Sequence, residues 1–126
     1  MNKIMKLTAS LGQFEQLILT AVMALQDDAY GLQIYSKVCE LAGREMSLGS
    51  TYVTLDRLQK KGYISSKVAE GGADRGGMPR KFYTMRPKGE QALLAAVETA
   101  TRISESFWSL PQWKPLHLKM FPKRSR

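Results

Sequence analysis

The spacing of hydrophobic residues changes from a helical to a strand-like period once along this sequence, at Gly62. Before this glycine, apolar residues recur every three or four positions. After it, residues 63–68 and 81–85 have the character of two short strands. The segment between them, residues 70–80, holds four glycines and one proline and predicts a long hairpin turn. The 126 residues are therefore expected to form one compact domain, α+β and mostly helical.

Three helices are predicted in the first half of the chain. The first covers about residues 11–25 with Ser10 as its N-cap, and the second covers residues 30–42 and is ended by Gly43. The third starts at Ser47, a residue type that favours helix N-termini, and continues to the change of period. We expect its buried row to be Leu48, Thr51, Leu55 and Leu58, with Tyr52 beside it. Its exposed row is predicted to be Ser50, Val53, Thr54, Arg57, Lys60 and Lys61.

A fourth helix is predicted to open at Pro87 and to continue to about Leu110, where Pro111 ends it. Some 24 residues would make it roughly 36 Å long. That length exceeds what a domain of this size needs to cover its own core. Its apolar side chains fall in a stripe of nearly heptad spacing, which predicts pairing with a second copy of the chain: Leu93, Leu94, Val97, Ala100, Ile103 and Phe107.

Positive charge is concentrated in one internal block and one tail. The net charge is +8. Nine basic residues lie between Arg57 and Lys88, against Glu70 and Asp74 alone, and residues 114–126 contain no acid at all. Such a block is typical of a partner that is a polyanion, although many basic faces are merely solvated.

Several other classes of protein are disfavoured. No apolar run reaches the roughly 20 residues that span a bilayer, and the N-terminus lacks the apolar core of a secretory signal. The single cysteine, Cys39, allows no internal disulfide, and His117 has no second ligand at metal-binding spacing. Because no catalytic constellation is visible either, we expect a cytoplasmic protein that is not an enzyme and that uses no metal or cofactor.

Three helices followed by a two-stranded hairpin is the order of a winged helix-turn-helix. In such a unit the exposed face of the third helix enters the major groove of duplex DNA, and the hairpin, or wing, contacts the backbone. Ser50, Val53 and Thr54 suit contacts with base edges, and Arg57 suits either a guanine or a phosphate. The full set of predicted DNA-binding residues is Ser50, Tyr52, Val53, Thr54, Arg57, Lys60, Lys61, Arg75, Arg80 and Lys81. Tyr52 has the alternative of packing inward.

The sequence resembles the PadR family of bacterial transcription regulators over roughly residues 11–110. Residues 11–19 (LGQFEQLIL) and 28–31 (DAYG) are similar to the start of the family's first and second helices. Residues 47–62 (SLGSTYVTLDRLQKKG) are similar to its recognition helix, and residues 75–83 (RGGMPRKFY) to its wing. Two departures are the threonine at Thr51, where the family usually has a larger aliphatic residue, and the basic tail after Pro111.

This resemblance implies a transcriptional repressor, of the short branch whose single C-terminal helix builds a homodimer. It implies three parts: a DNA-binding domain over residues 10–86, a dimerisation helix over residues 87–110 and a basic irregular tail over residues 111–126. It also implies release by a small hydrophobic or aromatic effector. Phe107 and Trp108 are candidates to hold such an effector, with burial of dimer surface as the alternative. Tyr30 and Tyr35 are assigned to the core, with a ligand pocket as the alternative. The runner-up function is a winged helix that docks proteins without specific DNA binding.

Overall fold

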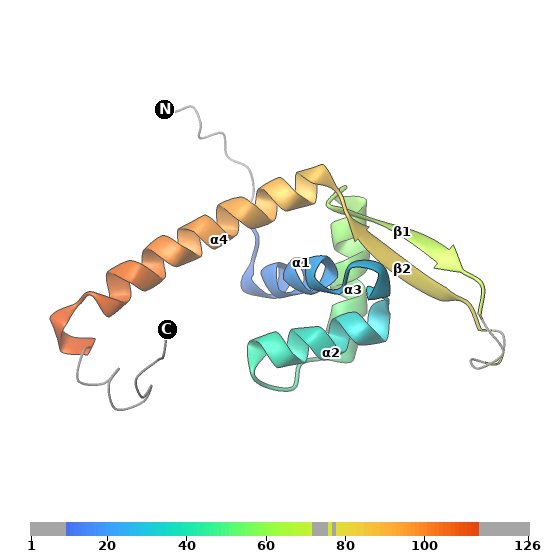
Figure 1. The fold of residues 1–126 in the computed structure, drawn as a ribbon, viewed down its shortest axis with the longest axis horizontal. Coiled ribbons are helices and arrows are strands. Elements are labelled where there is room, and N and C mark those ends of the chain that lie inside the picture. The colour runs from blue at the N-terminus through green and yellow to red at the C-terminus, as the bar shows by residue number, and fades with distance from the viewer. Residues whose placement is uncertain (1–9, 72–75, 77, 114–126) are drawn as a thin grey trace. The chain divides into compact units, whose positions relative to one another are not determined.

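The computed structural model of the chain describes residues 10–71, 76 and 78–113. It contains four α-helices and one antiparallel pair of strands within these residues (Figure 1). Their order along the chain is α1 (Gln13–Leu25), η1 (Gln26–Asp28), α2 (Gly31–Ala42), α3 (Leu48–Lys60), β1 (Ile64–Ala69), β2 (Arg80–Met85), α4 (Pro87–Trp108) and η3 (Pro111–Trp113). This is the predicted succession of helices and hairpin, and the winged-helix fold is confirmed. No helix in these residues has the length and apolar character needed to cross a bilayer.

The first helix begins later than predicted. Gly12, and not Ser10, is the N-cap of α1. The reason is Glu15, whose side chain reaches back so that its Oε1 accepts a hydrogen bond from the Gly12 N–H at 2.9 Å. A carboxylate in the first turn satisfies a donor of the helix terminus and interacts favourably with the helix dipole.

The predicted end of the second helix and the predicted start of the third are confirmed by their local geometry. Gly43 follows α2 in the left-handed conformation, at φ 73°, and its N–H donates to the carbonyl oxygen of Cys39. Ser47 caps α3, because its Oγ accepts a hydrogen bond from the Ser50 N–H at 3.0 Å. These contacts fix where α3 starts and therefore which of its side chains face outward.

The core of the helical part is apolar and tightly closed. Its fully buried side chains come from all three helices and from the hairpin: Ile18, Leu19, Val22, Ile34, Val38, Leu55, Leu58 and Ile64. Two expectations for α3 were wrong, because Leu48 is 40% exposed whereas Thr54 is only 4% exposed. Leu48 lies in the first turn of α3, and the buried row passes through Thr51, Thr54, Leu55 and Leu58 instead. Thr51 is accommodated because its hydroxyl donates to the Ser47 carbonyl oxygen at 2.9 Å.

The hairpin is anchored to the segment between α1 and α2. Its strands pair from Ile64 opposite Met85 to Ala69 opposite Arg80, one residue beyond the predicted bounds at the turn. A further bridge joins Tyr30 to Phe82. Beside it, the Tyr83 N–H donates to the Ala29 carbonyl oxygen at 2.8 Å. The base of the wing is thus tied directly to the start of α2.

The chain divides into two compact units, one up to Leu93 and one from Leu94 onward. The first turns of α4 belong to the first unit, where Leu93 is 7% exposed and Gly89 is buried against Tyr63. A β-carbon at Gly89 would collide with the Tyr63 carbonyl oxygen. The rest of α4 exposes most of its apolar side chains, as described below. Its 22 residues end at Trp108, two residues before the predicted limit.

We expect Gly89→Ala to lower the free energy of unfolding by about 1–3 kcal/mol, because the added methyl group meets backbone that cannot rotate away. Urea denaturation followed by circular dichroism measures the change. Gly49→Ala is the matched control, since a β-carbon there meets only the Ser47 Oγ, at 3.9 Å. In the control, the helix propensity of alanine should leave the free energy of unfolding unchanged or raise it. Equal losses in both variants would contradict the packing argument.

Candidate nucleic-acid interface

The outer face of α3 carries side chains of several chemical kinds in a short length of helix. Ser50, Val53 and Arg57 are all exposed, and Val53 is 59% exposed. The valine lies between a hydroxyl and a guanidinium, so that methyl groups and polar groups alternate on this face. It suits a surface that meets base edges, where a methyl group can contact the methyl group of thymine.

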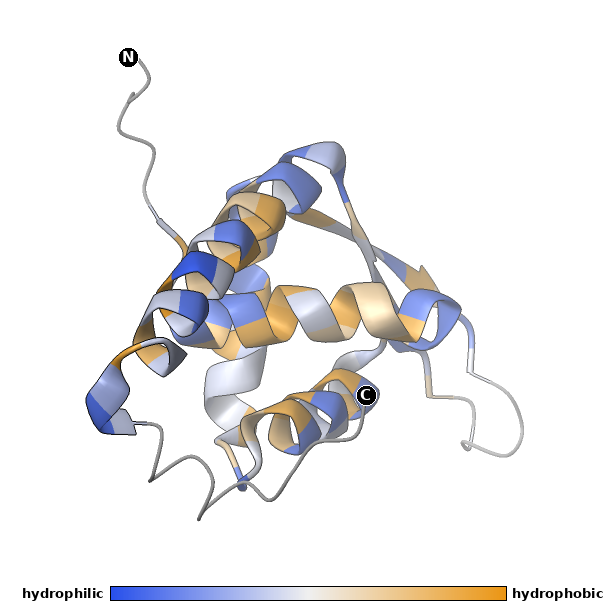
Figure 2. Cartoon of the chain, turned by 60° about the vertical axis from the view of Figure 1, so that its left-hand side comes forward, coloured by the Kyte–Doolittle hydropathy of each residue, from blue (hydrophilic) through white to orange (hydrophobic). Residues whose placement is uncertain are grey.

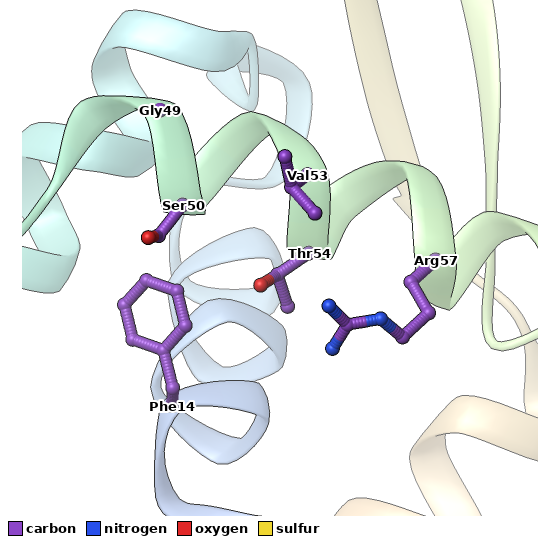
Figure 3. A pocket seen from close by; sticks show the side chains of 6 residues that line it. All are labelled: Phe14, Gly49, Ser50, Val53, Thr54 and Arg57. Carbon is purple, nitrogen blue, oxygen red and sulfur yellow. The ribbon is translucent and has the colours of Figure 1, made fainter.

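A groove of about 480 Å³ runs along this face, between the start of α1 and α3. Figure 3 shows the aromatic ring of Phe14 on one side and the guanidinium of Arg57 turned toward Thr54. The remaining lining residues are Gly49, Ser50 and Val53. Arg57 forms no ion pair or side-chain hydrogen bond within the described residues. An unpaired guanidinium with hydroxyls and a ring beside it can bind a phosphate or a base edge.

Two residues of this groove were misjudged from the sequence. Thr54 was placed in the exposed row, but it offers the groove only a small part of its surface. Phe14 is not among the residues predicted to contact DNA, yet it is half-buried and lines the groove. Helical spacing gives each residue a direction around its own helix. It does not show that the start of α1 borders α3.

Two of the predicted cations are engaged in ion pairs on the surface. Lys60 Nζ lies 3.2 Å from Asp56 Oδ2 in the same helix, and Lys61 Nζ lies 3.3 Å from Glu15 Oε2 of α1. The Lys60–Asp56 pair is exposed, and such a pair contributes about 0–1 kcal/mol. The Glu15 side chain is only 14% exposed, so Lys61 is the more firmly held of the two lysines. Each pair reduces what its lysine gains from contact with a DNA phosphate.

Tyr52 follows neither of its two predicted alternatives fully. It is exposed, yet its ring lies against Gly31, at the start of α2, where a β-carbon would collide with it. Its phenol and the Asp56 carboxylate help to raise the pKa of Tyr83, although burial of Tyr83 is the main cause of that increase. The Tyr52 side chain therefore packs between α3 and the start of α2, near Tyr83 of the wing, and part of its ring remains on the surface.

On the wing, Lys81 is exposed, whereas Arg80 is half-buried. The guanidinium carbon of Arg80 lies 3.9 Å from the centroid of the Tyr30 ring. Arg75, also predicted to contact DNA, lies outside the described residues, as does the basic tail from residue 114 onward. Tyr35, by contrast, has a structural contact, since its hydroxyl donates to the Met46 carbonyl oxygen at 2.8 Å.

The predicted dimerisation stripe on α4 is largely exposed. Leu94, Val97, Ala100 and Ile103 are exposed, and Ile103 is 63% exposed. Figure 2 shows hydrophobic residues recurring along this helix. Leu93 differs, because it packs into the core of its own chain and has little surface left for a partner, and Phe107 is half-buried.

The C-terminal end of α4 carries an aromatic cluster. The ring of Phe107 stacks on that of Trp113, with centroids 4.6 Å apart and planes at 29°. Trp108 meets Phe107 edge-on at 4.7 Å and 80°. Trp113 was not singled out from the sequence, because it lies past the proline that ends the helical pattern. Its proximity results from the short turn η3.

Comparison with known proteins agrees with this geometry. The model of the transcriptional regulator PadR-like family matches residues 18–95. A PadR-like transcriptional regulator from Bacillus cereus is 26% identical, with a TM-score of 0.64 over 78% of this chain and 90% of that chain. A PadR family transcription regulator from Clostridium difficile is 24% identical (TM-score 0.59; 78% of this chain and 96% of that one). One from Eggerthella lenta is 20% identical (TM-score 0.60; 75% and 80%). None of the curated proteins compared with the sequence matches it.

Proposed function

Because the chain belongs to the PadR-like family of transcriptional regulators, we propose that it is a homodimeric repressor of a two-fold symmetric DNA site. The family consists of regulators and not of enzymes, and the chain is accordingly a DNA-binding regulator. The observation that carries the proposed DNA contact is the groove on α3, with its exposed Val53 and with an Arg57 that has no ion pair among the described residues. A protein that acts on the chromosome must share its compartment, so the proposal also places the chain in the cytoplasm.

In this proposal α3 lies in the major groove of the DNA. The side chains that line the protein's own groove on α3 then face the bases. Ser50 and Val53 contact base edges, and Arg57 binds a guanine or a phosphate beside them. Lys60 and Lys61 serve as weaker phosphate contacts, because each first has to leave an ion pair. On the wing, Arg80 and Lys81 contact the backbone and fix the register without reading sequence.

The dimer is proposed to form through residues 94–107 of α4. Its exposed row of Leu94, Val97, Ala100 and Ile103 gives two copies a continuous apolar seam to bury. Two recognition helices related by a two-fold axis then require half-sites about one helical turn of DNA apart. Repression itself is proposed from the family resemblance.

An effector site is proposed at the aromatic cluster of Phe107, Trp108 and Trp113. The stacked and edge-on rings offer the kind of surface on which a planar hydrophobic compound can stack. Burial of dimer surface by the same rings is the alternative. Quenching of tryptophan fluorescence by added aromatic acids, together with release of bound DNA, separates the two.

The proposed function is tested by selecting bound duplexes from a random pool at about 0.15 M salt, which suppresses nonspecific binding. We expect enrichment of a two-fold symmetric motif by the full chain. Arg57→Ala is the control, and it should enrich a weaker motif or none. A pool that stays unenriched with folded, dimeric protein would overturn the proposal and favour the protein-docking function instead.

A further inference from the structure

One cation of the wing is held in place by a residue of the helical part. The guanidinium carbon of Arg80, the first residue of β2, lies 3.9 Å from the ring centroid of Tyr30, the N-cap of α2. This is well within the roughly 6 Å over which a cation is attracted to the face of an aromatic ring. The two residues lie 50 positions apart in the sequence, so the contact joins two separate elements.

The Tyr30 ring is itself fixed. Its backbone forms the bridge with Phe82, and the Tyr30 N–H donates to the Asp28 carbonyl oxygen at 2.9 Å. Its ring also meets that of Phe82 edge-on, with centroids 5.5 Å apart and planes at 67°. Arg80 is two residues before Phe82 on the same strand, so both side chains lie on the face of the hairpin that Tyr30 borders. Tyr30 is therefore a rigid support.

The polar edge of Arg80 has no partner among the residues that the structure describes. Within the described residues its guanidinium forms no ion pair and no hydrogen bond. A planar guanidinium that lies on a ring still has its N–H donors in its own plane, where they can bind a phosphate. Attraction to the Tyr30 ring thus holds the cation without using a hydrogen-bond acceptor, and the N–H donors of Arg80 remain available to a phosphate.

We propose that Tyr30 is a positioning residue for DNA binding, which holds Arg80 ready to donate to a backbone phosphate beside the wing. This inference rests on the proposed function. Its physical basis is entropic, because a long side chain that is ordered before binding loses less freedom when it binds. Lys81, the next residue, is exposed and lies over no aromatic ring of the described residues, so its phosphate contact should contribute less.

The test measures the dissociation constant of the full chain for the selected duplex, at one fixed salt concentration. Tyr30→Leu removes the ring and keeps an apolar side chain, and we expect it to raise the Kd about three- to fivefold. Tyr30→Phe keeps the ring face and should bind within about twofold of the unmodified protein. Circular dichroism and thermal melting confirm that each variant is folded. If Tyr30→Phe loses as much affinity as Tyr30→Leu, the hydroxyl group matters and the proposal is wrong.

A double-mutant cycle separates positioning from a general effect on the fold. In an Arg80→Ala background, Tyr30→Leu should cause no further loss of affinity, because the side chain that it positions is gone. In a Lys81→Ala background, which removes the same charge one residue away, the loss from Tyr30→Leu should persist. Equal losses from Tyr30→Leu in both backgrounds would overturn the proposal, since Tyr30 would then act on the wing as a whole.

The contact can also be tested from its other side if Tyr30→Leu does not fold. Arg80→Lys keeps the charge but loses the planar group that stacks on the ring, and it should raise the Kd about threefold. An unchanged Kd would overturn the inference. The proposed function has a separate test, because it is wrong if the unmodified chain binds no duplex. Binding by the unmodified chain that is unaffected by Arg80→Ala contradicts only the role of Tyr30.

Discussion

Replacing both Val97 and Ile103 with aspartate is expected to yield a folded monomer and to weaken binding to a two-fold symmetric duplex by about 100-fold or more. Both side chains are exposed on α4, Val97 at 45% and Ile103 at 63%. In the proposed dimer each faces the partner's apolar seam. A carboxylate buried there without a cation would be costly enough to prevent association.

DNA affinity is lost because the two recognition helices are no longer held together in one dimer. In a dimer the second recognition helix binds its half-site at a high effective concentration, because the first has already bound. A monomer has no such advantage, yet its own α3 and wing are unaltered. We therefore expect the variant to bind a single half-site about as weakly as the unmodified protein binds it, which distinguishes dissociation from unfolding.

The matched control is Arg102→Asp, which changes the charge by the same two units from the opposite face of α4. Arg102 makes one exposed contact, a hydrogen bond from its Nη2 to Thr99 Oγ1 at 3.2 Å. Its replacement should leave the dimer intact. Sedimentation equilibrium measures the mass of each variant. A double aspartate variant that still sediments as a dimer would show that the interface lies elsewhere.

The sequence predicts best those features that depend on neighbouring residues. The cap at Ser47 and the left-handed glycine at Gly43 were both identified correctly, because the groups that they satisfy lie within a few residues. The change of period at Gly62 also identified the hairpin. Such local preferences act in the same way whatever the rest of the fold does.

The contacts that define the candidate interface depend instead on how separate elements pack. Leu48 and Thr54 differ by six positions, and apolar character alone favours burying the leucine. In the structure α3 packs against α1, α2 and β1, and its buried row includes Thr54, whereas its first turn with Leu48 is exposed. The same holds for Phe14 at the groove and for Tyr30 beneath Arg80, whose partners are distant in the sequence.

Arg57→Ala is expected to raise the Kd for the selected duplex about 10- to 100-fold, the loss typical of a guanidinium that reads a guanine. Arg57 is the cation of the groove, and nothing within the described residues has to be broken for it to bind. Lys60→Ala, which removes a cation three residues further along the same helix, is the control. Lys60 must first leave Asp56, so we expect its loss to be only a few-fold.

The affinity of the Arg57→Ala variant, measured against salt concentration and DNA sequence, shows which group Arg57 contacts. If it binds a phosphate, the variant should weaken all duplexes alike, and the slope of log K against log salt should fall by about one unit. If it binds a guanine, the variant should lose preference at one base pair of each half-site, with a smaller change of slope. The apolar side chains of Phe14 and Val53 beside it favour the guanine contact, because they fit against base edges better than against the hydrated backbone. An affinity within twofold of the unmodified protein, for every duplex and salt concentration, would remove Arg57 from the interface and with it the proposed orientation of α3.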